Sequence, residues 1–330
     1  MTAEYGGRLV TASPMAAPES AHEQAQALVN AVERVVLGRR AAVELTVAAV
    51  IAGGHVLIED VPGSGKTTMA RALAQALGGT FRRVQATADL MPADITGSSV
   101  WEPSRSAFSF VPGPLFANVV LVDELNRASP RTQSALLEAM DEAAVTVDGV
   151  RHLLPDPFVL LATQNPFEQW GTYPLPEGQL DRFAALVHPG LNAEDVERQI
   201  VRDQLVAPTV DLLRPVMPVG DLPALRRAVR STHVSDLVLG YAVAVVGATR
   251  SYPGVAIGAS TRAAIALVRC AQARAVLQGR PHVLPDDIKA LAVPVLGHRL
   301  VLSGDDGGHA RGQQVIADIV AKVPAPLSGA

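Results

Sequence analysis

The chain has 330 residues, 48% of them hydrophobic, and a formal net charge of −4. This length predicts about two domains with ample material for their cores, and the charge gives no indication of binding to nucleic acid or to an anionic membrane. The one cysteine, Cys270, lies in an apolar helical run. It excludes an internal disulfide and is expected to be a small core residue.

The first 24 residues are rich in Ala, Ser, Pro and Glu, which predicts a flexible tail. They do not contain a basic start followed by an apolar stretch, so no secretory signal is expected. The longest apolar run, LVLGYAVAVVGA, is too short to span a bilayer. We therefore expect a cytoplasmic protein without membrane insertion.

Five short apolar segments alternate with helical ones, at residues 55–59, 80–87, 118–124, 157–165 and 184–189. This alternation predicts a parallel sheet covered by helices on both faces. Ligands of such sheets bind beyond the carboxyl ends of the strands. Polar residues follow the first, third and fourth segments at that edge, so we expect them to converge on one site.

A glycine-bearing loop follows the first segment, with the sequence PGSGKTT. Inward-facing backbone N–H groups of such a loop bind phosphate oxygens, and the ammonium of Lys66 would reach the β and γ phosphates. Thr67 would bind magnesium through its hydroxyl. The next residues predict a helix that ends at Gly78 and Gly79 and points its positive end at the phosphates. The expected ATP-binding residues of this loop are Pro62, Gly63, Ser64, Gly65, Lys66, Thr67 and Thr68.

The strict P-loop pattern has a glycine where this chain has Asp60. Gly63 and Gly65 are retained, so the inner part of the phosphate cradle is expected to form. The alternative is an ordinary turn between strand and helix with incidental glycines. The strand before the loop and the helix after it favour the phosphate-binding interpretation.

Two carboxylates, Asp123 and Glu124, end the third segment after four apolar residues. Asp123 could hold magnesium through its water shell, and Glu124 could deprotonate the water that attacks the γ phosphate. The alternative is that the pair caps a helix beginning near Ser129. Asn165, after the fourth segment, could hydrogen-bond the γ phosphate and this water, or could be a turn residue before Pro166.

Two further segments predict β-hairpins. One is SSVWEPSRSAFSFVPGPLF, and the other is VTVDGVRHLL, where Asp148 and Gly149 suit a type I′ turn. The aromatic residues Trp101, Phe108 and Phe110 of the first hairpin could contact a partner or could pack the insertion itself.

The alternation ends after about Leu191. Helices are predicted at residues 192–205, 221–231, 236–250, 261–277 and 285–296, and in a last stretch at 313–323. Together they would form a helical lid over the nucleotide. Ser260 reads as an N-cap, which puts Arg262 in the first turn of a helix, where the macrodipole disfavours a cation. A nucleotide phosphate or a nearby Asp or Glu would offset this cost.

Several stretches in a fixed order resemble the MoxR family of AAA+ ATPases: DLMPADITG, FVPGPLFANVVL, LVDELNRASPRTQSALLEAMDEAAVTVDG, ATQNPFEQWGTYPLPEGQLDRF and GASTRAAIALVRCAQARAVLQGRPHVLPDDI. The likeness runs from about Val35 to about Pro326. It implies an α/β fold with a P-loop AAA+ core, a parallel five-stranded sheet between helices, at residues 25–191. An all-α lid would follow at 192–326, with tails at 1–24 and 327–330. The Asp60 departure is similar to loops within the family.

The resemblance implies a role for each polar residue of the site. Asp123 and Glu124 would be the Walker B carboxylates and Asn165 the first sensor. Arg182 would be the arginine finger that enters the active site of the neighbouring subunit. Arg262 would be the second sensor.

Two of these assignments have ordinary structural alternatives. From the residues alone, Arg182 could form a surface ion pair with Glu177 or Asp181. The stretch VVLGRR resembles the segment that packs on adenine, with Leu37 and Gly38 as contacts, but both residues could equally belong to the core.

The function implied by the resemblance is magnesium-dependent ATP hydrolysis by a ring, expected to be a hexamer, that remodels or activates a protein client. The family's usual partners contain von Willebrand factor A domains, often in metalloenzyme complexes. Its two hairpins, the insert in the second helix and the hairpin before the first sensor, would face the pore of the ring.

Two other functions have weaker support in the sequence. One is a nucleotide-gated switch with very slow turnover, which would not need Glu124, Asn165 and Arg182 together. The other is a nucleic-acid motor, which is disfavoured because the predicted hairpins carry few cations, Arg105 and Arg151.

Overall fold

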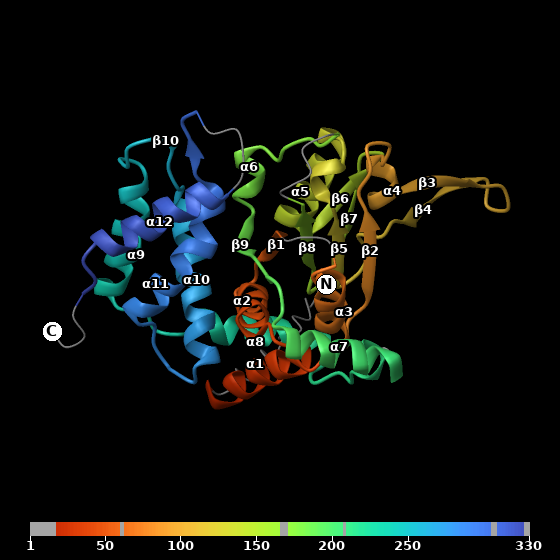
Figure 1. Cartoon of the computed structure of the whole chain (residues 1–330). Helices are drawn as coiled ribbons and strands as arrows, with labels where there is room; N and C mark the ends of the chain where they lie inside the picture. Colours follow the sequence, from red (N-terminus) through yellow and green to blue (C-terminus); the bar gives the residue numbers. More distant parts are fainter. Residues whose placement is uncertain (1–17, 60–62, 166–170, 207–208, 305–308, 327–330) are drawn as a thin grey trace, which may run out of the picture.

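The computed structural model describes residues 18–59, 63–165, 171–206, 209–304 and 309–326. The core is a five-stranded parallel sheet with strand order β2-β5-β8-β1-β9. All five predicted strands are confirmed, with bounds β1 (His55–Glu59), β2 (Phe81–Gln85), β5 (Val119–Asp123), β8 (Val159–Gln164) and β9 (Phe183–Val187). In Figure 1 this sheet lies beside a helical part built by the C-terminal third of the chain.

Alternate residues of the strands point into two hydrophobic clusters. Val119 and Leu121 of β5 belong to the cluster that contains buried residues of α1 (Pro18–Glu33), α2 (Arg40–Ile51) and α3 (Lys66–Ala76). Val120 and Val122 belong to the other, which contains residues of α4 (Pro92–Thr96) and α5 (Pro130–Glu142). The sheet is therefore covered on both faces, which explains the nearly continuous apolar runs of its strands.

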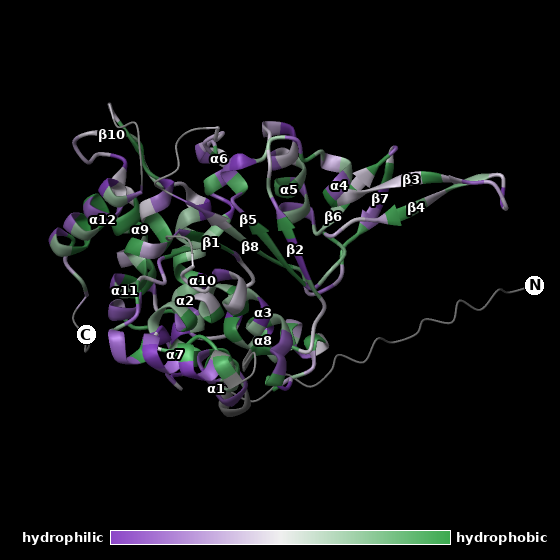
Figure 2. Ribbon diagram, turned by 45° about the vertical axis from the view of Figure 1, so that its right-hand side comes forward, coloured by the Kyte–Doolittle hydropathy of each residue, from purple (hydrophilic) through white to green (hydrophobic). Residues whose placement is uncertain are grey.

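Both predicted hairpins are confirmed. The first consists of β3 (Gly97–Glu102) and β4 (Ala107–Pro112) and projects from the core in Figure 2; the second consists of β6 (Ala144–Val147) and β7 (Val150–Leu153). Asp148 and Gly149 have φ values of 50° and 78°, as a type I′ turn requires. The rings of Phe110 and His152 stack 3.8 Å apart and join the two hairpins.

The aromatic residues of the first hairpin differ in their contacts and in their exposure to solvent. Phe110 packs between the hairpins and also contacts Phe116, so it is part of the scaffold. Trp101 and Phe108 pack edge to face on each other, but their exposed fractions are 50% and 70%. These two side chains remain available to a partner.

The helices predicted for the C-terminal part are confirmed: α7 (Glu194–Val206), α8 (Leu222–Arg230), α9 (Asp236–Thr249), α10 (Thr261–Leu277), α11 (Pro285–Leu296) and α12 (Ala310–Lys322). Short 3₁₀ segments are η1 (Leu125–Arg127), η2 (Thr209–Leu212), η3 (Val219–Asp221) and η4 (Gly297–Arg299). The lid is not entirely helical, because β10 (Val255–Ile257) pairs with β11 (Val301–Leu302). These strands are too short to produce a recognisable period in the sequence.

The lid packs directly on the core. α10 contacts α1, α2 and β9, and α11 also contacts β9. Buried residues of α9 to α12 belong to the same hydrophobic cluster as those of α1 to α3. Cys270 of α10 is buried there, as predicted, and burial raises the pKa of its thiol to about 12.

The N-terminal boundary differs from the prediction. α1 begins at Pro18, and Ala21, Ala25 and Leu28 are buried with helical spacing, so residues 18–24 are not part of a tail. Proline suits the first turn of a helix, and alanine favours helix, so the composition that suggested a tail is also compatible with α1. In the described part of the chain, no helix is long and apolar enough to cross a membrane.

Candidate active site

A cavity of about 350 Å³ opens at the carboxyl edge of the sheet. It collects most of the predicted site residues from the loop after β1 and from the ends of β5 and β8. Pro62 lies outside the described residues. The lining residues are Gly63, Ser64, Gly65, Lys66, Thr67, Thr68, Arg83, Gln85, Asp123, Glu124, Thr163, Gln164 and Asn165.

The loop after β1 has the conformation that a phosphate cradle needs. Gly63 and Gly65 have φ values of +81° and +84°, and a Cβ built on either would meet no atom within 4 Å. Glycine is therefore required for the backbone angle, and the space beside it is open. α3 begins at Lys66, directly after this loop, and its N-cap is Gly65, which has no side chain to cap the helix. The N-terminus of a helix favours an anion through its dipole and N–H groups. This arrangement fits the phosphates of a nucleotide.

A buried arginine, Arg39, which no motif in the sequence singles out, holds this loop. The Nη1 of Arg39 donates to the carbonyl of Ser64 at 2.5 Å, and its Nε donates to Asn192 Oδ1 at 3.0 Å. The adjacent Gly38 has a φ of +72°, and a Cβ there would lie 2.9 Å from Val196 of α7. The predicted Leu37–Gly38 segment thus lies next to the phosphate loop and α7, although neither residue lines the cavity.

Asp123 is the buried last residue of β5. Its Oδ2 accepts from Arg83 Nε at 2.5 Å, and its Oδ1 accepts from the hydroxyl of Thr163 at 3.3 Å. A buried carboxylate needs such partners, because burial without them disfavours the charged form. Asp123 lines the same cavity as Thr67, and their oxygen atoms are of the kind that binds a divalent cation.

Glu124 follows β5 in the left-handed region, with φ 57° and ψ 47°. Its backbone N–H donates to Thr163 Oγ1 at 2.9 Å, and its Oε2 accepts from Gln85 Nε2 at 3.0 Å and pairs with Arg127 Nε at 2.9 Å. Backbone strain of this kind is found at functional sites. These contacts orient the carboxylate of Glu124, which lines the cavity.

The helix-capping alternative for these two carboxylates is wrong. Ser129 is the N-cap of α5, and its hydroxyl accepts from the N–H of Thr132 at 3.4 Å. Asn165, the first residue after β8, lines the same cavity as Asp123 and Glu124.

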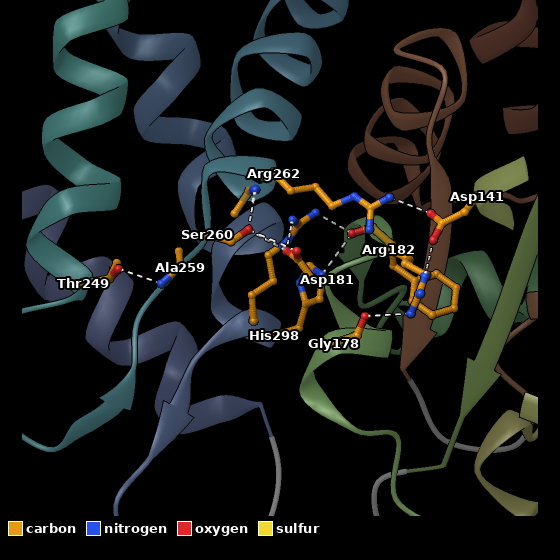
Figure 3. A network of polar contacts seen from close by, with 12 residues as sticks. Asp141, Gly178, Asp181, Arg182, Thr249, Ala259, Ser260, Arg262 and His298 are labelled. Carbon is orange, nitrogen blue, oxygen red and sulfur yellow. Dashed lines mark hydrogen bonds and ion pairs between the residues drawn. The ribbon is translucent and has the colours of Figure 1, made fainter. Parts of the chain in front are cut away.

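Arg182 and Arg262 lie in a second cavity, of about 270 Å³, which shares no lining residue with the first. Arg182 follows α6 (Glu177–Leu180), and its Nε donates to Asp141 Oδ2 at 2.6 Å. Arg262 Nη2 donates to the other oxygen of Asp141, also at 2.6 Å. Figure 3 shows both guanidinium groups at this one carboxylate.

Two expectations about these arginines are corrected. Arg182 pairs with Asp141 rather than with Glu177 or Asp181. Ser260 is the N-cap of α10, as predicted, but the group that offsets the position of Arg262 is a carboxylate and not the phosphate cradle of the same chain. α10 packs against α2 and β9, and Arg262 in its first turn lines the second cavity.

Comparisons with known proteins agree with this architecture. The family described as ATPase family associated with various cellular activities (AAA) matches residues 55–185, and the AAA lid domain matches residues 247–319. A crystal structure of a protein from Cytophaga hutchinsonii, assigned as a candidate ATPase, is 34% identical with a TM-score of 0.85, covering 94% of this chain and 97% of that one. A full-length MCM homolog from Methanopyrus kandleri shares the fold, with a TM-score of 0.52 and 17% identity over 94% of this chain and 62% of its own.

Three similar proteins match most of the chain. Uncharacterized protein YeaC of Bacillus subtilis is 44% identical over 95% of this chain and 98% of its own length. Chaperone MoxR1 of Mycobacterium tuberculosis is 39% identical over 83% of this chain and 74% of its own, and protein MoxR of Paracoccus denitrificans is 32% identical over 83% and 87%. The chain therefore belongs to the MoxR family of AAA+ ATPases.

Proposed function

We propose that this protein hydrolyses ATP with the help of magnesium and uses the energy to remodel or activate a protein client. The observation that carries the proposal is the single cavity that joins the phosphate loop with Asp123, Glu124 and Asn165. A binding site alone would need the loop but not the strained, hydrogen-bonded Glu124. The family, in which one relative is named a chaperone, supports the same function.

Each residue of the cavity has a distinct role in this proposal. The N–H groups at the start of α3 and the ammonium of Lys66 bind the β and γ phosphates. Magnesium, when held by Thr67 and through water by Asp123, supplies positive charge to the phosphate oxygens. Glu124 accepts a proton from the attacking water, and Asn165 orients this water.

Arg182 does not line the cavity of its own chain, so it can act on a nucleotide only across an interface with another copy. We therefore propose a ring, as a hexamer, in which Arg182 and Arg262 face the phosphates of the neighbouring subunit. Arginine is suited to stabilise the charge of a transferring phosphoryl group.

The client is proposed to bind at the two hairpins. Trp101 and Phe108 expose large apolar side chains on the one that projects from the core. A protein with a von Willebrand factor A domain is the proposed class of client, and the cytoplasm is the proposed location.

Three variants test the proposed activity. Lys66→Ala is expected to lose ATP binding, and therefore also turnover in steady-state assays, because the ammonium that neutralises charge on the β and γ phosphates is gone. Glu124→Gln is expected to retain binding of a fluorescent ATP analogue while losing turnover, because the amide cannot accept the proton. Glu138→Gln, an exposed residue of α5, serves as the matched control and should behave as the wild type. A Glu124→Gln variant with normal turnover would refute the assigned role and favour a binding switch.

A further inference from the structure

Asp141 lies in the last turn of α5, and the helix dipole disfavours a carboxylate at that end. Arg262 lies in the first turn of α10, where the dipole disfavours a cation. Each charge is thus in an unfavourable position on its own helix, and the two meet at 2.6 Å. Since α5 belongs to the core and α10 to the lid, this contact joins the two parts of the chain.

The same carboxylate also holds Arg182. Its Oδ2 accepts from Arg182 Nε, and on the other side Arg182 Nη1 donates to the carbonyl of Gly178 at 2.8 Å. These two bonds fix the guanidinium plane, yet Nη2 makes no hydrogen bond with any described residue. Within the described part of the chain, Arg262 likewise donates a hydrogen bond only through Nη2, to Asp141. Asp141 therefore orients both cations and leaves donor groups of each unused.

The charge balance of the cavity leaves it positive. Arg182, Arg262, Arg269 and Arg299 line it together with Asp141 and Asp181. Asp181 is already engaged, because it accepts from the buried Arg299 at 2.7 Å and from the hydroxyl of Ser260 at 3.0 Å. The remaining positive charge suits an anion such as a phosphate.

Asp141 is ionised at neutral pH. Partial burial alone would raise the pKa of this carboxyl, but the hydrogen bonds and charges of Arg182 and Arg262 outweigh it and hold the pKa below its usual value. A permanent carboxylate between two arginines keeps them from repelling each other at short distance.

We propose that Asp141 is a positioning residue that binds Arg182 of the core and Arg262 of the lid side by side, so that both are presented as one unit to the phosphates of a neighbouring copy. This inference rests on the proposed function, because it needs ATP hydrolysis completed between subunits. Asp141 does not touch the nucleotide. It acts through the two arginines and sets the position of the lid helix α10 relative to α5.

The test compares Asp141→Asn, Asp141→Glu and the adjacent Glu142→Gln in steady-state ATP hydrolysis at ring-forming concentration. Glu142 is a matched control, since it is the next residue, its side chain is 55% exposed, and its ion pair with Arg151 is long, at 3.6 Å. Asp141→Asn should lower kcat about tenfold with KM changed less than about twofold, because small misplacement of catalytic groups reduces the rate more than ground-state binding. Asp141→Glu keeps the charge and should fall between this variant and the wild type.

A double variant separates positioning from a general structural role. If Asp141 acts through the arginines, then Asp141→Asn added to Arg182→Ala should lower kcat by less than it does in the wild type, because one of the two groups being positioned is already gone. Full additivity of the two losses would overturn the proposal. An Asp141→Asn variant as active as Glu142→Gln would also overturn it. So would a variant more active than the wild type, because Asp141 would then be a counter-ion that keeps the arginines from the phosphates of the neighbouring copy.

Self-association with a non-hydrolysable ATP analogue provides a readout that does not depend on turnover. Asp141→Asn should raise the protein concentration at half-association, and Glu142→Gln should not. If the wild type associates without hydrolysing ATP, the proposed activity fails, and the inference is then tested by self-association alone. In that case a higher protein concentration at half-association for Asp141→Asn supports the inference. An unchanged concentration overturns it.

Discussion

Replacing Arg182 with alanine is expected to remove ATP turnover while leaving ATP binding and folding nearly intact. Arginine fingers accelerate phosphoryl transfer by about 10³- to 10⁵-fold, which corresponds to about 4–7 kcal/mol of transition-state stabilisation. ATP affinity should change little, because an arginine that stabilises the transferring phosphoryl group acts mainly on the transition state and not on bound ATP. The loss should therefore be almost entirely in kcat.

The effect of the same substitution on folding should be far smaller. The Arg182 side chain is 27% exposed and makes one ion pair, with Asp141, and one hydrogen bond, to the carbonyl of Gly178. Such contacts contribute about 1–2 kcal/mol together. Asp141 keeps its second partner, Arg262, so no buried charge is left unpaired.

Three assays separate these quantities: steady-state hydrolysis, titration with a fluorescent ATP analogue, and denaturant unfolding. Mixing Arg182→Ala subunits with Glu124→Gln subunits adds a test of the interface, because a Glu124 site in one subunit can then receive Arg182 from the next. Activity should partly return in the mixture. No recovery in verified mixed rings, or loss of ATP binding by Arg182→Ala alone, would refute the proposed role of Arg182 in the active site of the neighbouring subunit.

Two further predictions concern folding. Burial lowers the pKa of His55 to about 4, and its Nδ1 accepts from Leu160 N–H, so protonation opposes folding. The free energy of unfolding should fall by up to about 3 kcal/mol through this residue as pH decreases from about 6.5 towards 4, and His55→Gln should remove that part of the decrease in denaturant titrations. Gly38→Ala should destabilise the fold by more than about 1 kcal/mol, because φ is positive and a Cβ would lie 2.9 Å from Val196. Gly190→Ala has the same φ strain in open space, so equal losses in thermal unfolding would contradict the proposed clash.

The sequence was sufficient to predict the strands and most residues that line the first cavity, at the carboxyl edge of the sheet. Apolar runs that end in polar residues identify the carboxyl edge of a parallel sheet without knowledge of the strand order. Arg83 and Gln85 could not be found in this way, because they reach Asp123 and Glu124 only since β2 lies next to β5. Strand order depends on tertiary packing that local patterns do not encode.

The second cavity was less predictable for a related reason. Asp141 is 41 residues from Arg182 and 121 residues from Arg262 in the chain, and its position near a helix end suggests no partner. The unfavourable first-turn position of Arg262 did indicate that an anionic group lies nearby. Only the packing of α10 on α2 and β9 decides that this group is Asp141 rather than the phosphate cradle of the same chain.

The proposed ATPase site is completed by a neighbouring copy of the chain. The most direct test is steady-state ATP hydrolysis as a function of protein concentration, with the native mass recorded at each point in the presence of ATP and magnesium. We predict that specific activity rises together with a ring-sized mass, because a neighbouring copy completes the site. Full specific activity at the mass of a monomer, or ATP binding without turnover in an assembled ring, would contradict it.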